Sequence, residues 1–277
     1  MKIGDFTIGS GRTFIVAECG INHDGSLDRA LKLIDAAYIA GADAVKFQTF
    51  RAAELGCTPD IAKCELPPEA WPVLALHAAA LGIIFFSTPF DCESVDLLDP
   101  LVPCFKIASG EITNEKLLRH VAGKGKLVIL STGMATYDEI YDARDWLNRE
   151  WFQTILLHCV SAYPAPAEDM NLRAITRLAD KFPGPIGLSD HSLGTAIPVA
   201  AVALGACVIE KHLTLDPTMP GPDHAMSTIP ETFGRMVREI RIVEQALGDG
   251  VKKVQPSEEA ARLKSRRDPM TGRRPCQ

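Results

Sequence analysis

Short apolar runs alternate with helical patterns along most of the chain. The runs contain four or five residues, mainly Val, Ile, Leu and Phe. Such runs are typical of strands buried on both faces of a sheet. We expect strands at residues 14–18, 44–48, 83–87, 104–108, 127–131, 154–158, 185–189 and 208–212. We expect helices between and after them at residues 26–40, 67–81, 92–98, 114–122, 137–149, 172–181, 195–204 and 230–247.

Capping signals support several of these helices. Ser26 is a typical N-cap residue for the first helix, and Gly41 is a typical end signal for it. Thr136 and Glu139 have the spacing of a capping box before the fifth helix. The sequence Gly-Asp-Gly at 248–250 is expected to end the last helix.

Strict alternation of eight strands with eight helices predicts parallel βαβ units, and eight units in about 240 residues predict a closed (β/α)8 TIM barrel. A doubly wound open sheet is the alternative, but no G-x-G-x-x-G sequence follows the first strand. The first twelve residues predict a short β-hairpin at the lower end of the barrel. We expect the barrel to occupy residues 1–250 and a basic, partly disordered tail to occupy residues 251–277.

Composition narrows the functional class. The chain has 277 residues, 47% of them hydrophobic and 23% charged, which excludes a disordered or fibrous protein. A net charge of −6 gives no reason to expect a nucleic acid or an anionic membrane as partner. We find no apolar stretch long enough for a membrane span or a signal peptide, so we expect a cytoplasmic protein. The eight cysteines form no CxxC pair, so we expect reduced cysteines rather than a zinc knuckle.

The candidate chemistry lies at the strand ends, because TIM barrels carry their active sites at the carboxyl ends of the strands. Ionisable or hydroxyl residues end all eight predicted strands, and burying such groups is costly unless they are paired or used. One group suits a small anion bearing phosphate or carboxylate, and it comprises Lys46, Ser87, Thr88, Lys106, Ser109, Ser131 and Thr132.

A second group is rich in carboxylates and imidazoles, and it comprises Glu18, His191, Glu210, His212 and Asp223. His191 and His212 end consecutive strands, so we expect them about 5 Å apart. Two imidazoles with oxygen-rich neighbours favour an open site for an ion such as Mn²⁺ or Mg²⁺ over closed tetrahedral zinc. His23 and His224 lie in neighbouring loops, where a structural role and an approach to substrate are both open.

The chain resembles the N-acetylneuraminate (sialic acid) synthase family. The matching segments follow the family's order and cover almost the whole predicted barrel, and they include AECGINHDGS (17–26), GADAVKFQTF (41–50), FKIASGE (105–111), GLSDHSLG (187–194), VIEKHLT (208–214) and PGPDHAMS (220–227). The resemblance implies metal-dependent condensation of phosphoenolpyruvate with an aldose of the N-acetylmannosamine type or a relative. The products would be a nonulosonic 2-keto-3-deoxy acid and phosphate. The implied cofactor is a divalent metal, first Mn²⁺, with Mg²⁺ and Co²⁺ as alternatives.

The resemblance also implies roles for individual residues. His191 and His212 are the expected metal ligands, and the expected catalytic residues are Glu18, Lys106, Glu210 and Asp223. Either Glu18 or Asp223 would activate the water that adds to the intermediate. The expected substrate-binding residues are Lys46, Gln48, Thr88, Ser109, Gly110, Glu111, Ser131, Ser161, Tyr163 and Ser189. Ser161 departs from the family pattern, because some members have Asn at that position.

The amino-acid pattern leaves the partners and the exact reaction class open. Family members usually continue into a C-terminal antifreeze-like domain, which we expect this chain to lack. A homodimer, and a separate lid protein acting in trans, are therefore open partner arrangements. A metal-dependent aldolase or hydrolase on the same barrel is the second enzyme hypothesis. A non-catalytic barrel that serves as a partner subunit is the third hypothesis, although the lysine and histidine positions are all retained.

Overall fold

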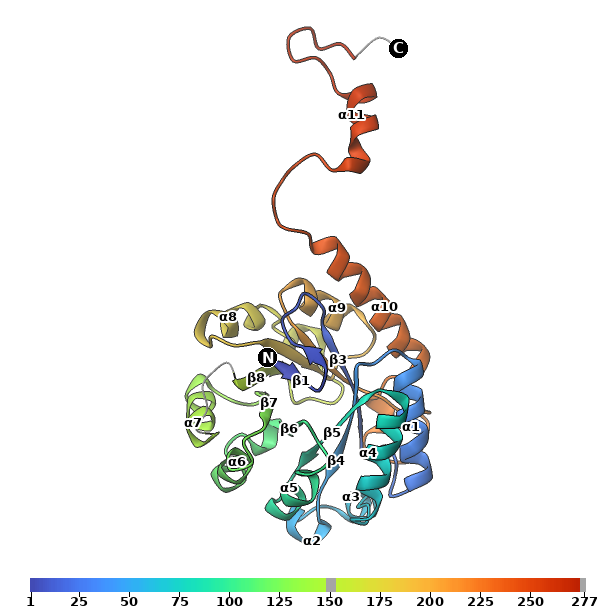
Figure 1. Cartoon of the computed structure of the whole chain (residues 1–277), viewed down its shortest axis with the longest axis vertical. Coiled ribbons are helices and arrows are strands. Elements are labelled where there is room, and N and C mark those ends of the chain that lie inside the picture. The colour runs from blue at the N-terminus through green and yellow to red at the C-terminus, as the bar shows by residue number, and fades with distance from the viewer. Residues whose placement is uncertain (148–152, 275–277) are drawn as a thin grey trace. The chain divides into compact units, whose positions relative to one another are not determined.

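The computed structural model describes residues 1–147 and 153–274 and divides into two compact units, Met1–Glu244 and Gln245–Gln277. The first unit contains eight parallel strands (Figure 1). They are β3 (Phe14–Gly20), β4 (Ala44–Thr49), β5 (Ile84–Pro89), β6 (Cys104–Ile107), β7 (Leu127–Ser131), β8 (Thr154–Cys159), β9 (Ile186–Asp190) and β10 (Val208–His212).

The strand order is that of a TIM barrel rather than a doubly wound sheet. The hydrogen-bonded ladder runs β5-β4-β3-β10-β9-β8-β7-β6, so β3 and β10, the first and last of these eight strands along the chain, are direct neighbours. The two ends of the ladder, β5 and β6, pack against each other without a registered ladder pair in the described residues. The predicted (β/α)8 barrel is therefore confirmed, and it is nearly closed.

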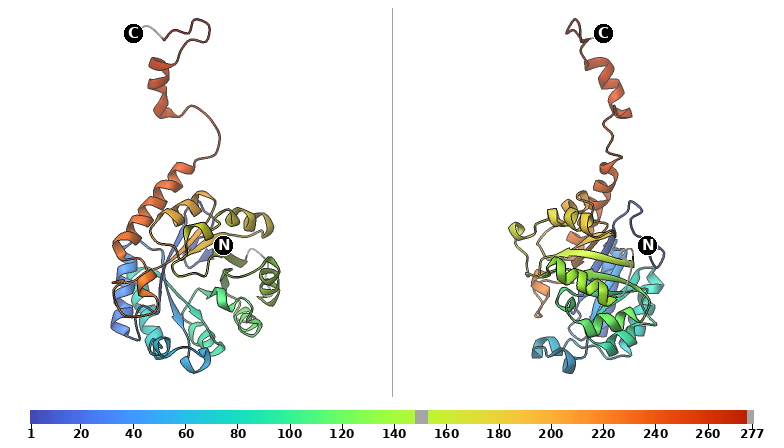
Figure 2. Two further views of the ribbon diagram at one scale, coloured as in Figure 1. Left: turned by 180° about the vertical axis from the view of Figure 1, so that it is seen from behind. Right: turned by 90° about the vertical axis from the view of Figure 1, so that its left-hand side faces the viewer.

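Helices alternate with the strands and lie outside them (Figures 1 and 2). They include α1 (Leu27–Ile39), α4 (Ala70–Leu81), α5 (Cys92–Leu98), α6 (Glu115–Ala122), α7 (Tyr137–Leu147), α8 (Arg173–Lys181), α9 (Ala196–Ala203) and α10 (Pro230–Leu247). Ser26 caps α1 by accepting a hydrogen bond from the Arg29 N–H, as predicted. Thr136 and Glu139 form the predicted reciprocal capping box before α7. The predicted end of that helix, at 148–149, lies outside the described residues.

The segment between β4 and α4 contains two short helices that the sequence did not predict. They are α2 (Ala52–Leu55) and α3 (Pro59–Ala62), each of four residues. A single turn is too short to carry a hydrophobic period, so pattern analysis cannot identify it. Short 3-10 turns also occur after β6 (η1, Ser109–Glu111), after β8 (η3, Ala167–Asp169) and after β10 (η4, His224–Met226).

The N-terminal hairpin pairs β1 (Lys2–Ile3) with β2 (Phe6–Thr7) in antiparallel register. Ile3 is fully buried, and the Phe6 ring lies 4.8 Å from the ring of Phe14, where β3 begins. Gly4 lies beside the side chain of Ile84, where β5 begins. The hairpin therefore packs at the amino ends of the strands, opposite the end that carries the candidate site.

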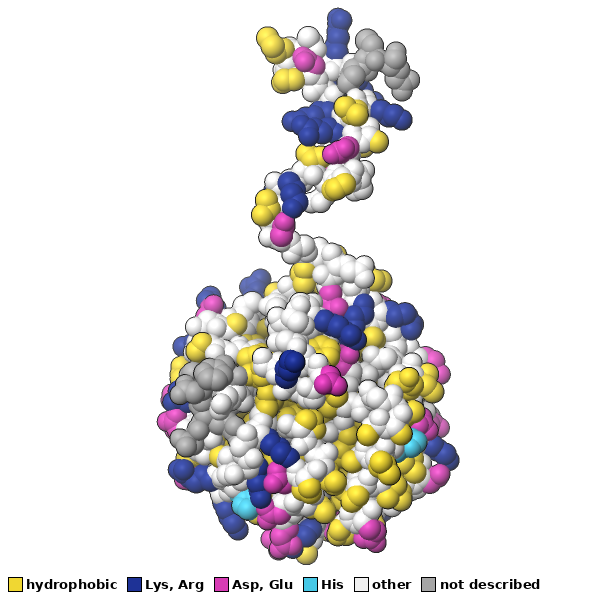
Figure 3. Space-filling view, viewed as in Figure 1, with side chains coloured by type: hydrophobic (Ala, Val, Ile, Leu, Met, Phe, Trp, Pro, Cys, Tyr) yellow, Lys and Arg dark blue, Asp and Glu magenta, His cyan; other side chains and the backbone are white. Residues whose placement is uncertain are grey.

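The outer surface of the barrel is mixed in character. Figure 3 shows charged side chains spread over one face and apolar side chains gathered over α1 and α4. The exposed apolar side chains of these two helices include Ile39, Val73 and Leu76. No helix in the described parts of the chain is both long and apolar enough to span a membrane.

The second unit contains η5 (Pro256–Glu258) and α11 (Glu259–Ser265). Gln255 and Glu258 form a reciprocal capping box at this turn. All described side chains of the unit are exposed, so it has no apolar core of its own. The predicted boundary at residue 250 and the partial disorder of the tail stay predictions.

Candidate active site

Four charged side chains meet at the carboxyl ends of β3, β4, β6 and β10. Lys46 Nζ lies 2.7 Å from Glu18 Oε2 and 3.8 Å from Glu210 Oε2. Lys106 Nζ lies 3.8 Å from Glu210 Oε1. All four side chains are at most 6% exposed. Two lysines and two carboxylates balance in charge, which reduces the cost of burying them.

Neutral donors and acceptors surround these charges. Lys46 Nζ donates to Thr88 Oγ1 at 2.8 Å, and Lys106 Nζ donates to the Ile107 carbonyl at 2.9 Å. Ser189 Oγ donates to Glu210 Oε1 at 3.1 Å. The structure therefore brings the predicted residues Lys46, Thr88, Lys106, Ser189 and Glu210 into one cluster.

The two buried glutamates have different electrostatic environments. Burial raises the pKa of Glu18 to about 7, assisted by nearby Glu210 and opposed by Lys46. Burial also disfavours the charged form of Glu210, but Lys106 and Lys46 outweigh it and hold the pKa of Glu210 below its usual value. Sites that transfer protons typically hold two carboxylates in environments that give them different pKa values. Glu18 is thus suited to exchange a proton near neutral pH, while Glu210 stays ionised.

Gly20 makes room for three predicted site residues to converge. Its φ angle is +51°, next to a register shift between Glu18 and Gly20 in β3. A Cβ atom at Gly20 would lie 3.3 Å from Gln48 Nε2, 3.3 Å from Glu18 Oε1 and 3.4 Å from Asp223 Oδ2. Gln48 Nε2 also donates to Glu18 Oε1 at 3.1 Å. The side chains of Gln48, Glu18 and Asp223 therefore face one space at the mouth of the barrel.

The two predicted metal ligands lie side by side, with ring centroids 5.6 Å apart. His191 Nδ1 lies 2.7 Å from the Val160 carbonyl, which can only accept, so Nδ1 carries the hydrogen and Nε2 is the atom that could bind a metal. Burial disfavours the charged form of His191, but Cys159 and the Val160 carbonyl outweigh it and raise the pKa of this ring. Burial lowers the pKa of His212 well below its usual value, which favours the neutral form of this ring. The ring of Tyr163 packs against His191 with centroids 4.1 Å apart.

The donor set fits two ligands of an open metal site rather than a complete cage. Within residues 1–147 and 153–274, no group of three or more His, Cys, Asp or Glu side chains is placed to hold a metal ion. The buried Nδ1 atom of His212 has no hydrogen-bond partner. Neutral imidazoles are the form that binds metals, and open sites take their other ligands from water or substrate. His191 and His212 therefore fit the pair of ligands that the sequence predicts.

Buried polar atoms without hydrogen-bond partners concentrate at this end of the barrel. Such atoms are rare in folded proteins, since each one lacks the hydrogen bond that water would give it. Among the described residues they include five in the predicted site: Glu18 Oε2, Ser131 Oγ, Ser161 Oγ, Glu210 Oε2 and His212 Nδ1. The two glutamate oxygens still have Lys46 as an ionic neighbour. The pattern indicates polar groups placed to bind water or ligand atoms.

Gly133 brings two predicted serines together. Its N–H donates to Ser109 Oγ at 3.0 Å. A Cβ atom at this glycine would lie 2.8 Å from Ser109 Oγ and would collide with Ser161 Oγ. Gly110 and Glu111 lie in the adjacent η1 turn, where Glu111 Oε2 accepts from Asn114 Nδ2 at 2.7 Å. Substrate contact by Gly110 and Glu111 stays a prediction.

One pair in the predicted ring of strand ends has a different role. Lys211 Nζ lies 2.5 Å from Asp190 Oδ2 and donates to the Ser192 carbonyl at 2.6 Å. Asp190 and Lys211 each precede a predicted metal ligand, so alternation along the strands points them to the opposite face. They pair across neighbouring strands in register and are at most 2% exposed. This ion pair therefore joins β9 to β10 beside the histidines, and strand alternation could have separated it from the site.

Comparisons with known proteins agree with this geometry. The NeuB family model matches residues 33–252. An N,N'-diacetyllegionaminic acid synthase of Campylobacter jejuni is 46% identical over 271 residues, covering 90% of this chain and 81% of the relative. A protein of the same name from Legionella pneumophila is 44% identical over 285 residues, covering 94% of this chain and 80% of the relative.

A solved structure is similar over nearly the whole chain. The N-acetylneuraminic acid (sialic acid) synthetase of Leptospira borgpetersenii, crystallised in complex with citrate, superposes with a TM-score of 0.88 and 39% identity. The match covers 97% of this chain and 98% of that one. The chain therefore belongs to the NeuB family and is a carbon–carbon bond-forming enzyme of the sialic acid synthase type.

Proposed function

We propose that this enzyme condenses phosphoenolpyruvate with an aldose of the N-acetylmannosamine type, or a diamino-dideoxy relative, in a reaction that depends on a divalent cation. Phosphoenolpyruvate, aldose and water give a nine-carbon 2-keto-3-deoxy acid and inorganic phosphate. The observation that carries the proposal is the joint placement of two buried lysines and two buried histidines at one barrel mouth. The names of the relatives support the class of product.

Lys46 and Lys106 are the cations for the phosphate and carboxylate of phosphoenolpyruvate. Charge-assisted hydrogen bonds to such groups are roughly twice as strong as neutral ones. Ser131 Oγ and Ser161 Oγ are buried without a partner, so each can donate to the same anion. Glu210 keeps both lysines charged and in place before the substrate arrives.

His191 and His212 would hold the divalent cation, for which Mn²⁺ is our first candidate. When bound, such an ion supplies Lewis-acid polarisation of a carbonyl oxygen. The Val160 carbonyl fixes the orientation of His191. Tyr163 covers one side of the same ring.

Glu18 is the candidate for taking the proton of the water that adds at C2. Its pKa of about 7 allows it to accept and return a proton near neutral pH. Gln48 orients this carboxyl by donating to Oε1. Asp223 faces the same space and is the alternative base. C3 of phosphoenolpyruvate attacks the aldehyde carbon, and the ionised Glu210 stabilises the cationic intermediate at C2 until water adds there. Phosphate then leaves by cleavage of the carbon–oxygen bond.

Phosphate release tests this function directly. The chain is incubated with phosphoenolpyruvate and Mn²⁺ and with N-acetylmannosamine, a diacetamido-dideoxyhexose or mannose. We expect phosphate release that requires both the metal and an aldose of one class. Lys46→Met should lose most of this release. Lys32→Met should lose none, because Lys32 is an exposed lysine paired with Asp28. Release without any aldose would indicate a hydrolase, and aldose consumption without phosphate release would indicate an aldolase.

A further inference from the structure

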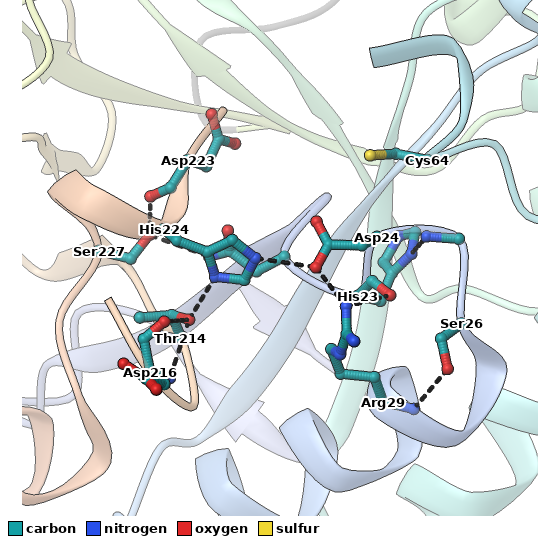
Figure 4. A network of polar contacts seen from close by, with 12 residues as sticks. His23, Asp24, Ser26, Arg29, Cys64, Thr214, Asp216, Asp223, His224 and Ser227 are labelled. Carbon is teal, nitrogen blue, oxygen red and sulfur yellow. Dashed lines mark hydrogen bonds and ion pairs between the residues drawn. The ribbon is translucent and has the colours of Figure 1, made fainter. Parts of the chain in front are cut away.

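A second polar cluster lies beside the site, where the loops after β3 and β10 meet (Figure 4). The ring of His224 lies between Thr214 and Asp24, and it is 1% exposed. His224 Nε2 is 3.0 Å from Asp24 Oδ2, and Nδ1 is 2.6 Å from Thr214 Oγ1. A carboxylate only accepts, so Nε2–H donates to Asp24, while Nδ1 lies within hydrogen-bond distance of the Thr214 hydroxyl. The imidazole therefore joins two loops that are 200 residues apart.

The contact has little freedom to rearrange. Asp24 has a φ angle of +47°, in the left-handed region, and its Oδ2 also pairs with the guanidinium of Arg29. A Cβ atom at Gly221 would lie 2.6 Å from His224 Cδ2 and 2.8 Å from Asp24 Oδ1. The backbone at Gly221 therefore closes over the imidazole and the carboxylate at a distance that only glycine allows.

His224 directly follows Asp223, whose carboxylate faces the site. The Asp223 carbonyl accepts from Ser227 Oγ at 2.5 Å, so its backbone is fixed on one side by Ser227 and on the other by the clamped ring of His224. In Figure 4 the Asp223 carboxylate points away from that ring. Asp223 Oδ2 instead lies near Gly20, in the space shared with Glu18 and Gln48.

We propose that His224 and Asp24 form a positioning pair that holds the Asp223 carboxylate in the barrel mouth during catalysis. This inference rests on the proposed function and assigns a role to two residues that touch no reacting atom. Their effect passes through the backbone of the β10 loop to Asp223. Removing the pair should therefore lower kcat only when residue 223 carries a carboxylate.

A double-variant cycle measures this dependence. His224→Ala should lower kcat on the order of 100-fold, because small displacements of a catalytic group have effects of that size. The KM for phosphoenolpyruvate should not change, since Lys46 and Lys106 are untouched. In an Asp223→Asn background the same change should have almost no further effect on kcat, measured with radiolabelled phosphoenolpyruvate.

Matched variants separate a positioning role of His224 from a general disturbance of the fold. His224→Gln retains a donor for Asp24 and should recover most of kcat. His77→Ala removes a histidine–aspartate contact of the same type, 2.7 Å from Asp35, on the outer surface and should leave kcat unchanged. Thr214→Val keeps the shape and removes only the hydroxyl, and it should give a smaller loss that also vanishes with Asp223→Asn. It replaces His224→Ala in the cycle if that variant does not fold.

The possible outcomes separate a failure of the positioning role from a failure of the proposed function. An equal loss of kcat with and without the Asp223 carboxylate, or a rise in the KM for phosphoenolpyruvate that accounts for the whole effect, overturns the positioning role. A wild-type chain that is inactive with every aldose overturns the proposed function and this role with it. An active wild type with additive variants overturns the positioning role alone.

Discussion

The two ends of the barrel use similar residue types in opposite ways. At the amino end, Asp43 accepts from Arg12, from the Ile15 N–H and from Arg241. At the carboxyl end, Glu18, Glu210 and His212 keep buried atoms without hydrogen-bond partners. Satisfied buried polar groups favour folding, whereas unsatisfied ones cost free energy unless a ligand pairs with them. The contrast identifies the carboxyl end as the functional one.

The amino-end network continues through α10. Arg241 donates to the Thr13 carbonyl and to Glu244 Oε1, each at 2.8 Å. Glu244 Oε1 also accepts from the Thr13 N–H at 2.6 Å. These bonds fasten the start of β3 to the last helix of the barrel. Changes there should alter stability and leave turnover intact, and changes at the other end should do the reverse.

The largest expected effect is on turnover in His212→Ala. We expect the two histidines to hold a divalent cation that stabilises the transition state by several kcal/mol. Losing this stabilisation should lower kcat roughly 1000-fold or more. A chelator should inactivate the wild type, and Mn²⁺ should restore it. Steady-state kinetics with circular dichroism as a folding control measure this. Full activity of the variant in metal-free buffer would contradict the assignment.

Asp43→Ala should have the largest effect on stability. It leaves Arg241 without one buried partner and the Ile15 N–H without an acceptor, so the free energy of unfolding should drop by about 3 kcal/mol. Urea unfolding measures the drop. The kcat of the folded variant should equal that of the wild type, and a large loss of kcat would erase the distinction between the two ends.

Lys106→Met should raise the KM for phosphoenolpyruvate about tenfold or more, because a charge-assisted contact contributes roughly 1.5–3 kcal/mol. Lys126→Met is the matched control, since Lys126 pairs with Asp99 away from the strand ends that carry the site. It should leave this KM unchanged. An unchanged KM in Lys106→Met would show that this lysine does not bind the anion.

The smallest expected effect concerns His23, which lies fully buried at the functional end. Burial lowers the pKa of His23 to about 4, while its Nδ1 accepts from the Gly25 N–H. The unfolded state therefore binds the proton first, so stability is complete above about pH 6.5 and falls as the pH drops toward 4. Between pH 6.5 and 5 the loss should be about 2 kcal/mol.

Urea unfolding at several pH values measures this loss. His23→Gln should flatten the dependence in that window, and His77→Gln on the surface should not. The same slope in both variants would exclude His23 as its source.

The sequence predicted the elements with long apolar runs best. The bounds of β7 and β10 agree with the structure to the residue, because each strand buries at least four of its five positions in one short run. The placement of Lys46, Glu18 and Glu210 at one end of the barrel followed from strand alternation and barrel topology. Their ion pairs did not, because the sequence assigned Lys46 to one group and the two glutamates to another. The Asp24–His224 contact did not, because it depends on the paths of two loops far apart in the chain.

Short turns and the partners of single polar groups were harder to predict. Helices α2 and α3 have one turn each and no period to detect. Asp190 and Lys211 directly precede the predicted metal ligands in the sequence, and strand alternation places them on the opposite face of their strands. Their ion pair became evident only from the register of β9 and β10.

The position of bond cleavage in phosphoenolpyruvate tests the central claim most directly. The reaction is run with the preferred aldose and Mn²⁺ in water labelled with oxygen-18, and phosphate and organic product are analysed by mass spectrometry. If water adds at C2 and the carbon–oxygen bond breaks, the phosphate stays unlabelled and one nine-carbon keto acid forms for each phosphate released. Labelled phosphate would show hydrolysis at phosphorus, and phosphate without the keto acid would show hydrolysis without carbon–carbon bond formation. Either result would contradict the account.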